Sequence, residues 1–593
     1  MGILHLHTYK YLKRIAVAGV LLTLWGCEAN RVNMRPALDH WTPVPAEEGV
    51  VVARIIDITD KTLPFNQLTL VPENVNASKE EKFERLLAVT PRPDTSSVFA
   101  SSVPPGKYAI NSVRTYFSSN QWWYDKAEWP EANLGTFEVK PGQITDLGTL
   151  VVYPKVNGER YNTIIFRLND YPAVDALTTY LPFYKHNPEF TNTWDEDGLE
   201  SDRLDTYIGA AQNPISFADT YTNAQGTTYF PSPLGIMMVR DNQGQWSLDA
   251  VETHYTLTAI AENSVGDLFV GSEEGQVFWR KQNSPWQEVF LAPGLNIEKL
   301  YFDNENEITA VASGLDSIEV YRGSVTDADF SWKKINAFNT STGWENNPND
   351  PDYPATSIPR AILKARFYEY DGESFLTLTS IKNAGDLIPN NTKNEYFQYD
   401  PSSWKVTKLD KQPQLSSVVQ AGNQKLGIKQ PGFWSFSQKP DYLRYDEVTQ
   451  SWSEMAKGVY CPAWGEEFDE KTHGDICHKE TAPATSAKKT IKSFDLISVP
   501  WFVDSKTGIA LVNFRKNNAW TGESSNTLKM VETNNGGASW SLTSRELPKP
   551  YCFDIVNDVQ DTLLLSCNGA TGDFYESDDL GKSWKHVREH QNL

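Results

Sequence analysis

The sequence predicts an all-β protein in which a small β-sandwich precedes a ring of about seven four-stranded sheets. Of its 593 residues, 40% are hydrophobic and 12% are aromatic, which is enough apolar surface for more than one core. Strand-like runs bounded by Gly and Pro recur between residues 47 and 155. From residue 160 onward, a polar turn that ends in tryptophan recurs with the spacing of β-propeller blades.

The N-terminal segment has the features of an export signal. Basic residues precede an apolar run over residues 15–25, which at about 16 Å is too short to span a hydrocarbon core of about 30 Å. The run ends in Leu-Trp-Gly-Cys at residues 24–27, a pattern that resembles the bacterial lipobox. The resemblance implies a signal peptide of residues 1–26, lipidation of Cys27 and a cell-envelope location, with Glu28 favouring the outer membrane. The alternative is an ordinary secretory signal that contains a cysteine.

Residues 27–46 are expected to form a tether, and residues 47–155 a small all-β domain. The tether segment contains three prolines and few large apolar side chains. In the domain, a Pro-Pro-Gly-Lys-Tyr turn at residues 104–108, a second Pro-Gly turn and a closing Leu-Gly-Thr-Leu strand at 147–150 resemble prealbumin-like sandwiches of bacterial surface proteins. The resemblance implies a two-layer β-sandwich.

An aromatic cluster lies between the predicted strands of this domain. It comprises Trp122, Trp123, Tyr124 and Trp129, within an otherwise polar segment. Such side chains would stack on sugar rings or anchor a protein partner. Packing against the second domain is the other interpretation, and the sequence leaves both open.

Seven tryptophans, each at the end of a polar turn, mark the rest of the chain. They are Trp246, Trp286, Trp332, Trp404, Trp452, Trp540 and Trp584. Successive members are 40, 46, 72, 48, 88 and 44 residues apart, a base period typical of four-stranded propeller blades. The two long intervals predict insertions near residues 339–362 and 456–492, although the second leaves room for an eighth blade. Residues 160–593 are therefore expected to form a β-propeller of about seven blades.

The last two of these turns resemble the Asp box of BNR, or sialidase-type, propellers. Their matching residues are Thr533, Asn535, Gly537 and Trp540 in one turn, and Ser577, Asp579, Gly581 and Trp584 in the other. A short oxygen side chain caps backbone N–H groups of the turn, and Gly supplies a positive φ. The resemblance implies a structural role at the rim. The Arg-Ile-Pro motif of sialidases is absent from the sequence.

Four cysteines follow Cys27, namely Cys461, Cys477, Cys552 and Cys567. An even number in an exported protein favours two disulfides, with three possible connectivities. Pairing of nearest neighbours would close two short loops, each worth roughly 3 kcal/mol in the chain-entropy treatment. A zinc site is the alternative for Cys477, which has His473 and His478 beside it.

One acidic segment raises the question of a metal. Asp195, Asp197 and Asp202 surround a Gly in the pattern that begins a calcium-binding loop, so Ca²⁺ is a candidate cofactor. The segment lacks the terminal bidentate Glu of that loop, because position 12 counted from Asp195 is Thr206. A solvated acidic loop is the alternative interpretation.

Charge and missing motifs limit the function. The formal net charge is −22, which disfavours binding to nucleic acid phosphates. The sequence has no zinc-protease, nucleophile-elbow, Walker or dinucleotide-binding motif, so no catalytic residue is assigned. We expect an envelope lipoprotein whose propeller binds an envelope protein or glycan. The alternative is a carbohydrate-active enzyme or glycan-binding protein with its site in the central funnel.

Overall fold

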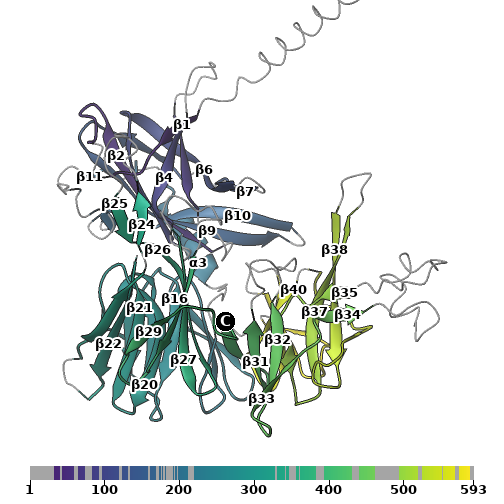
Figure 1. Ribbon diagram of the computed structural model, residues 1–593. Coiled ribbons are helices and arrows are strands. Elements are labelled where there is room, and N and C mark those ends of the chain that lie inside the picture. Colours follow the sequence, from purple (N-terminus) through teal and green to yellow (C-terminus); the bar gives the residue numbers. More distant parts are fainter. Residues whose placement is uncertain are drawn as a thin grey trace, which may run out of the picture.

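A computed structural model describes most of the chain between residues 32 and 587. The larger gaps lie at residues 74–82, 212–219, 346–355, 382–392, 430–439 and 461–492, and shorter gaps span at most six residues each. Two parts are visible in Figure 1, an N-terminal β-unit above and a ring of sheets below. Among the described residues, no helix has the length and apolarity that a membrane span requires.

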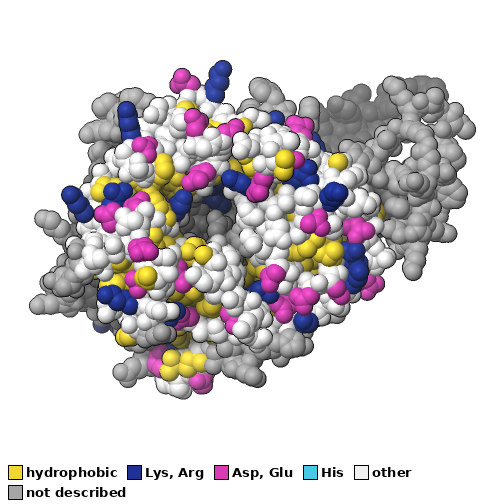
Figure 2. All heavy atoms as spheres, turned by 90° about the horizontal axis from the view of Figure 1, so that it is seen from below, with side chains coloured by type: hydrophobic (Ala, Val, Ile, Leu, Met, Phe, Trp, Pro, Cys, Tyr) yellow, Lys and Arg dark blue, Asp and Glu magenta, His cyan; other side chains and the backbone are white. Residues whose placement is uncertain are grey.

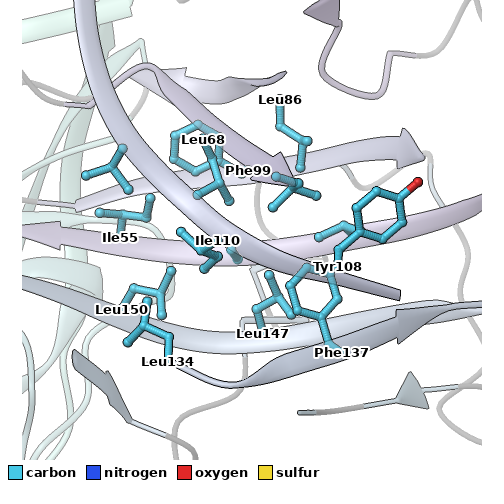
Figure 3. Packing of buried hydrophobic residues seen from close by; sticks show 14 of the residues in the cluster. Ile55, Leu68, Leu86, Phe99, Tyr108, Ile110, Leu134, Phe137, Leu147 and Leu150 are labelled. Carbon is cyan, nitrogen blue, oxygen red and sulfur yellow. The ribbon is translucent and has the colours of Figure 1, made fainter. Parts of the chain in front are cut away.

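The N-terminal β-unit consists of one eleven-stranded sheet with the order β10-β9-β2-β5-β4-β3-β6-β7, to which β1, β8 and β11 add at the sides. Its strands are β1 (Val32–Arg35), β2 (Gly49–Asp57), β3 (Gln67–Pro72), β4 (Phe83–Pro91), β5 (Ser96–Val103), β6 (Gly106–Ser118), β7 (Trp123–Glu128), β8 (Thr136–Val139), β9 (Ile144–Asn157), β10 (Arg160–Leu168) and β11 (Thr191–Asn192). Figure 3 shows side chains from several of these strands meeting in one core. The two-layer sandwich expected from the sequence stays a prediction.

Strand β2 is buried on both of its faces. Its odd-numbered side chains, Val51, Ala53 and Ile55, point into the core of the β-unit. Its even-numbered side chains point the other way, where Val50 and Val52 pack in a second apolar cluster. All nine residues of the strand are buried, which explains its continuous apolar sequence.

The N-terminal sheet extends beyond the range expected from the sequence. The expected boundary between residues 155 and 160 falls within a hairpin, because β10 pairs antiparallel with β9 from Arg160↔Asn157 onward. Asn157-Gly158 favours such a hairpin turn, a signal that the sequence does contain. Strand β1 lies inside the expected tether and pairs in parallel with β4.

Within the described residues, seven four-stranded sheets follow, each made of consecutive strands, so the seven-bladed propeller is confirmed. The first four blades are β12 (Tyr221–Thr222) to β15 (Trp246–Ala250), β16 (Leu257–Glu262) to β19 (Gln287–Glu288), β20 (Asn296–Asn304) to β23 (Lys333–Asn339), and β26 (Ala361–Tyr370) to β29 (Val406–Leu409). The last three are β30 (Ser417–Ala421) to β33 (Ser451–Glu454), β36 (Trp501–Phe502) to β39 (Ser541–Leu542), and β40 (Cys552–Val556) to β43 (Lys585–His586).

The middle strands of the blades complete the ring. They are β13 (Thr228–Pro231), β14 (Ile236–Arg240), β17 (Leu268–Ser272), β18 (Val277–Arg280), β21 (Glu307–Ser313), β22 (Ser317–Ser324), β27 (Glu373–Ile381), β28 (Lys393–Tyr399), β31 (Gln424–Lys429), β32 (Asp441–Asp446), β37 (Gly508–Asn517), β38 (Ser524–Thr533), β41 (Leu563–Cys567) and β42 (Asp573–Ser577). Each blade is antiparallel throughout, so its turns alternate between the two faces of the ring.

The two expected insertions contain two-stranded sheets. One is β24 (Thr342–Glu345) with β25 (Thr356–Pro359), and the other is β34 (Gly458–Tyr460) with β35 (Ser493–Asp495). In the described part of the second insertion there is no further four-stranded sheet. Besides strands, the described part of the chain contains the helix α3 (Glu200–Ala211) and the short 3-10 turn η2 (Glu273–Gly275).

Each of the seven predicted tryptophans lies at or just before the fourth strand of its blade and donates its indole N–H to the preceding blade. The acceptors are Glu576 Oε2 for Trp246 (3.5 Å), Asp249 Oδ1 for Trp286 (3.1 Å), Val289 O for Trp332 (2.7 Å), Tyr301 Oη for Trp404 (2.8 Å), Asp371 Oδ1 for Trp452 (3.3 Å), Ala456 O for Trp540 (3.1 Å) and Glu546 O for Trp584 (3.1 Å). The repeat seen in the sequence is therefore a repeat of contacts between blades.

In the described part of the chain, the first and last blades share no strand, and side chains make the contacts between them. Phe230 and Trp246 of the first blade pack against Phe574 of the last, with ring centroids 5.8 and 6.3 Å apart. Arg240 Nη2 donates to Thr562 Oγ1 (3.0 Å), and its Nη1 lies 3.3 Å from Asp561 Oδ1. An apolar cluster and a cationic side chain thus hold the seam.

One of the two predicted disulfides is present, between Cys552 and Cys567. The two residues face each other across β40 and β41, and both are fully buried. Cys461 and Cys477, with His473 and His478, lie outside the described residues, so the second pairing stays a prediction.

Replacing Trp404 by Ala tests the contact between blades. Trp404 is 0% exposed and stacks on Tyr399 at 4.6 Å, so the truncation should cost about 3–5 kcal/mol of unfolding free energy. The control is Trp129→Ala, where an indole that is 59% exposed should matter by roughly 0.5 kcal/mol or less. Urea denaturation measures both, and similar losses in the two variants would contradict the assignment.

Replacing both Cys552 and Cys567 by Ala tests the disulfide. The cross-link spans 15 residues, and its loss should lower the unfolding free energy by about 3 kcal/mol. The melting temperature of the unmodified protein should fall on reduction, while that of the double variant should change less. An equal response of the two proteins to reductant would contradict a stabilising cross-link at this position.

Candidate interaction surfaces

The N-terminal β-unit packs against one face of the propeller through an apolar cluster. Ile56, Val151 and Phe166 of the β-unit meet Leu234, which lies in the turn between β13 and β14. That turn joins the second and third strands of a blade. The β-unit therefore covers the face that carries such turns, and Figure 1 shows it above the ring. Turns between third and fourth strands lie on the opposite face.

A buried cation lies at the same junction. Arg54 is an even-numbered residue of β2, so it points away from the core of the β-unit, and it is 4% exposed. Its Nη1 lies 3.4 Å from Glu274 Oε1 in the propeller, and its guanidinium lies 5.0 Å from the centre of the Tyr255 ring. Glu274 adopts a φ of +61° in η2, a conformation that costs energy and that the junction must stabilise.

His254 completes this buried polar group. The side chain is 6% exposed, and its ring lies 4.1 Å from that of Tyr255. Burial, together with the nearby charge of Arg54, lowers the pKa of His254 to about 3. Burial also raises the pKa of Tyr255 to about 12. Both rings are therefore neutral across the physiological range, and Arg54 and the neighbouring glutamates carry the charge.

Helix α3 joins the two parts and has one buried and one exposed face. Arg203 and Ala210 are buried, and Tyr207 packs edge-on against Phe166 of β10. Leu204 and Ile208, one turn apart on the helix, are 57% and 42% exposed. Leu199, just before the helix, is 37% exposed. These three residues, which we call the α3 apolar face, are open to solvent beside the junction.

The predicted aromatic cluster is described only in part. Trp122 lies outside the described residues, and Trp123 and Tyr124 belong to β7, where only the backbone is described. Trp129 follows β7 and is 59% exposed, so its indole is available to a ligand. Strand β7 forms one end of the N-terminal sheet.

The predicted calcium residues take different places. Asp195 accepts a hydrogen bond from Thr136 Oγ1 (3.0 Å) and lies 3.3 Å from Lys107 Nζ. Asp202 is in the first turn of α3, where a negative charge is favourable, and Asp197 lies outside the described residues. Within the described residues, no group of three His, Cys, Asp or Glu side chains is arranged to hold a metal ion.

The two Asp-box-like turns lie between third and fourth strands, on the face away from the β-unit. Ser577 Oγ accepts from Gly581 N (2.7 Å), and Asp579 Oδ1 accepts from Ser583 N (2.9 Å). The Ser583 hydroxyl also donates to Asp579 Oδ2 (2.7 Å), and the hydrogen bonds to this carboxylate, that one most of all, lower the pKa of Asp579. Gly581 has a φ of +82°, and a Cβ there would lie 2.4 Å from Met530 Cε. The side chains of this turn are thus occupied in building it.

The other turn uses the same contacts with different side chains. Thr533 Oγ1 accepts from Gly537 N (2.9 Å), and Asn535 Oδ1 accepts from Ser539 N (3.0 Å). Trp540 follows and is buried.

The centre of the ring is hollowed on the face away from the β-unit, with charges of both signs around it (Figure 2). First strands of neighbouring blades meet there, as the bond from Thr258 Oγ1 to Ile297 O (2.6 Å) shows. Lys299 on β20 is half-buried, with Nζ 5.3 Å from the centre of the Tyr301 ring. Burial lowers the pKa of Lys299, and the negative charge of Glu369, on the first strand of the next blade, opposes this. The sequence does not single out this lysine, because strand alternation does not reveal which side chain is buried between blades.

Comparison with known proteins gives likenesses of fold only. No protein-family model matches the sequence, and no curated protein does. Among solved structures, YCF48 bound to D1 peptide is similar with a TM-score of 0.32 and 10% identity over 60% of this chain and 90% of that one. The propeller domain of the Trilobed protease from Pyrococcus furiosus has a TM-score of 0.33 and 7% identity, over 63% of this chain and 96% of that one. BamB from Moraxella catarrhalis has a TM-score of 0.28 and 11% identity, over 59% of this chain and 80% of that one. The sheet topology described above, rather than these likenesses, establishes the propeller.

Acidification should destabilise the protein through His254. An unfolded histidine binds a proton near pH 6.5, whereas in the folded protein the pKa of His254 is about 3. Stability therefore falls as the pH drops through this window, by about 2 kcal/mol between pH 6.5 and 5. Urea denaturation across that range should show a correspondingly smaller loss in His254→Gln. An unchanged pH dependence in that variant would contradict the assignment.

Replacing Arg54 by Met should uncouple the two parts of the chain. Removing one partner of a buried ion pair costs roughly 3–5 kcal/mol, because the other charge stays buried. The double variant Arg54→Met/Glu274→Met should recover part of that loss. The unfolding transition followed by tryptophan fluorescence should be steeper in the unmodified protein than in Arg54→Met, because the two parts of the variant would unfold more independently. Strictly additive losses in the double variant would contradict coupling between the two side chains.

Proposed function

We propose that this protein is an envelope lipoprotein, anchored through Cys27, whose propeller and adjoining α3 apolar face bind a protein partner. The observation that carries the proposal is the exposure of Leu204 and Ile208, at 57% and 42%, on a helix whose other face is packed. Exposed apolar side chains that adjoin each other mark interaction sites more often than scattered ones do. The lipobox-like sequence supports the anchor, and Glu28 favours the outer membrane.

The structure gives the proposed site a rigid base. Arg167 pairs with Glu200 at the start of α3, and Arg203 pairs with the same carboxylate at 2.8 Å. Tyr207 fixes the helix to β10. A helix held in this way presents its exposed face with little cost in conformational entropy on binding. Trp129, also exposed, is a second anchor for a partner.

A photo-crosslinking amino acid at position 204 or 208, introduced into the full-length protein in its native membrane, tests this function. We expect one protein to be captured at both positions and not from position 448. Val448 is a suitable control because it is 94% exposed and lies in a turn between third and fourth strands, on the opposite face. Capture of the same protein from all three positions would contradict a site on α3.

The double variant Leu204→Lys/Ile208→Lys measures the contribution of this face. Burying two such side chains contributes several kcal/mol, so the affinity for the captured protein should fall by about tenfold or more. Val448→Lys should bind as the unmodified protein does.

A glycan array run with the same variants addresses the alternative function. Turnover of a glycan that Glu369→Gln abolishes would replace the scaffold with an enzyme whose site lies in the ring centre.

A further inference from the structure

The first described strand begins very close to the proposed lipid anchor. Strand β1 starts at Val32, and only residues 28–31 separate it from Cys27. Five residue steps span at most about 18 Å even when fully extended, whereas the tether to residue 46 expected from the sequence would reach about 65 Å. Covalent geometry therefore limits the distance between the anchor and the folded protein to about 18 Å, whatever conformation the four residues adopt.

Strand β1 is an integral part of the sheet. It pairs with β4 from Val32↔Phe83 to Arg35↔Leu86. Glu84, which is 4% exposed, accepts from Asn33 Nδ2 (2.9 Å) and from Arg35 Nε (2.5 Å). Releasing β1 would break this pairing and leave the Glu84 carboxylate buried without its cation, which is costly.

A second contact network ties the chain after β1 to the sheet. Arg35 Nη1 also lies 3.0 Å from Glu48 Oε1. Leu38 N donates to Ala100 O (2.8 Å), and the Leu38 side chain is buried in the apolar cluster behind β2. The connection cannot lengthen by peeling these residues away without losing these contacts.

The described segment between residues 32 and 48, which contains β1, exposes little charge for so acidic a protein. Its exposed side chains, among the described residues between 32 and 48, are Met34, Pro36, Pro43, Pro45, Ala46 and Glu47. Only Glu47 among them is charged, in a chain of net charge −22. Arg35 is less exposed and pairs with both Glu48 and Glu84, which are also less exposed. This segment therefore adds little electrostatic repulsion toward an anionic bilayer.

We infer that the surface of this segment, which we call the β1 face, is a membrane-contact face that the short connection holds against the lipid headgroups. The inference rests on the proposed lipid anchor at Cys27. Figure 1 places β1 at the end of the β-unit away from the propeller. The ring therefore projects away from the bilayer, and its hollowed face in Figure 2 points outward from it.

Headgroup-specific fluorescence quenching tests the inference. A small fluorophore is attached through an encoded azide at position 34 on the β1 face, or at position 448 on the far face of the propeller. The lipidated protein is placed in vesicles of phosphatidylethanolamine and phosphatidylglycerol that carry a nitroxide on the headgroup. We expect quenching of roughly threefold at position 34 and none at 448, since the headgroup layer is only about 5–8 Å thick on each side. Ala46, exposed in the same segment, serves as a second position in case a label at Met34 disturbs β1.

A spacer variant isolates the role of the short connection. Inserting about twenty Gly and Ser residues between residues 30 and 31 adds roughly 25 Å of mean reach and should relieve most of the quenching at position 34. Unchanged quenching in this variant would contradict the role of the connection. Equal quenching at 34 and 448, or none at 34 and 46, would overturn the membrane-contact face.

Failure of the anchor is distinguished by flotation. If the protein does not float with the vesicles and its N-terminal peptide carries no acyl mass, the proposed lipidation and this inference fall together. If it floats and positions 34 and 46 remain unquenched, the anchor stands and the membrane-contact face is wrong. The variant Cys27→Ser should lose both flotation and quenching.

Discussion

The contact on which this molecule depends is the one between an indole and the preceding blade. Among the described strands, none is shared between the first and last blades, and the described contacts across that seam are made by side chains. Seven indole N–H groups bond to the neighbouring blade, including Trp246 to Glu576 at the seam. Each tryptophan contributes a large apolar area and one polar atom that must be satisfied when buried. The two requirements together fix how one sheet lies against the next.

In the N-terminal β-unit, one strand is buried on both of its faces. Strand β2 fills one core with its odd residues and packs behind the sheet with its even residues. Arg54 belongs to the second set, and at this one point the outer face of β2 carries a charge into the junction. The charge requires a partner from the propeller, which Glu274 and the face of Tyr255 supply. Apolar packing brings the two parts together, and the buried ion pair makes their arrangement specific.

The parts of the fold that could be predicted are those that repeat. The tryptophan period predicted about seven blades, and the two long intervals predicted the insertions, because loops vary in length while the contacts between blades do not. The strand limits were less predictable. Strand β1 and the β9–β10 hairpin belong to the N-terminal sheet because of partners distant in sequence or across a turn, and alternation of apolar residues alone does not identify a partner. The sequence left the disulfide connectivity open, and the structure pairs Cys552 with Cys567 because they face each other across neighbouring strands.

The sequence by itself determined the all-β class, a ring of about seven blades and the turn chemistry at Asp579, since each depends on residues close together in the chain. Only the tertiary structure decided which apolar residues remain uncovered and which charges become buried. Leu204 and Ile208 have the spacing of a core-facing pair, yet helix α3 turns its other face inward because Tyr207 meets Phe166. The difference is physical: local patterns fix periodicity, whereas burial depends on what the rest of the chain places opposite each side chain.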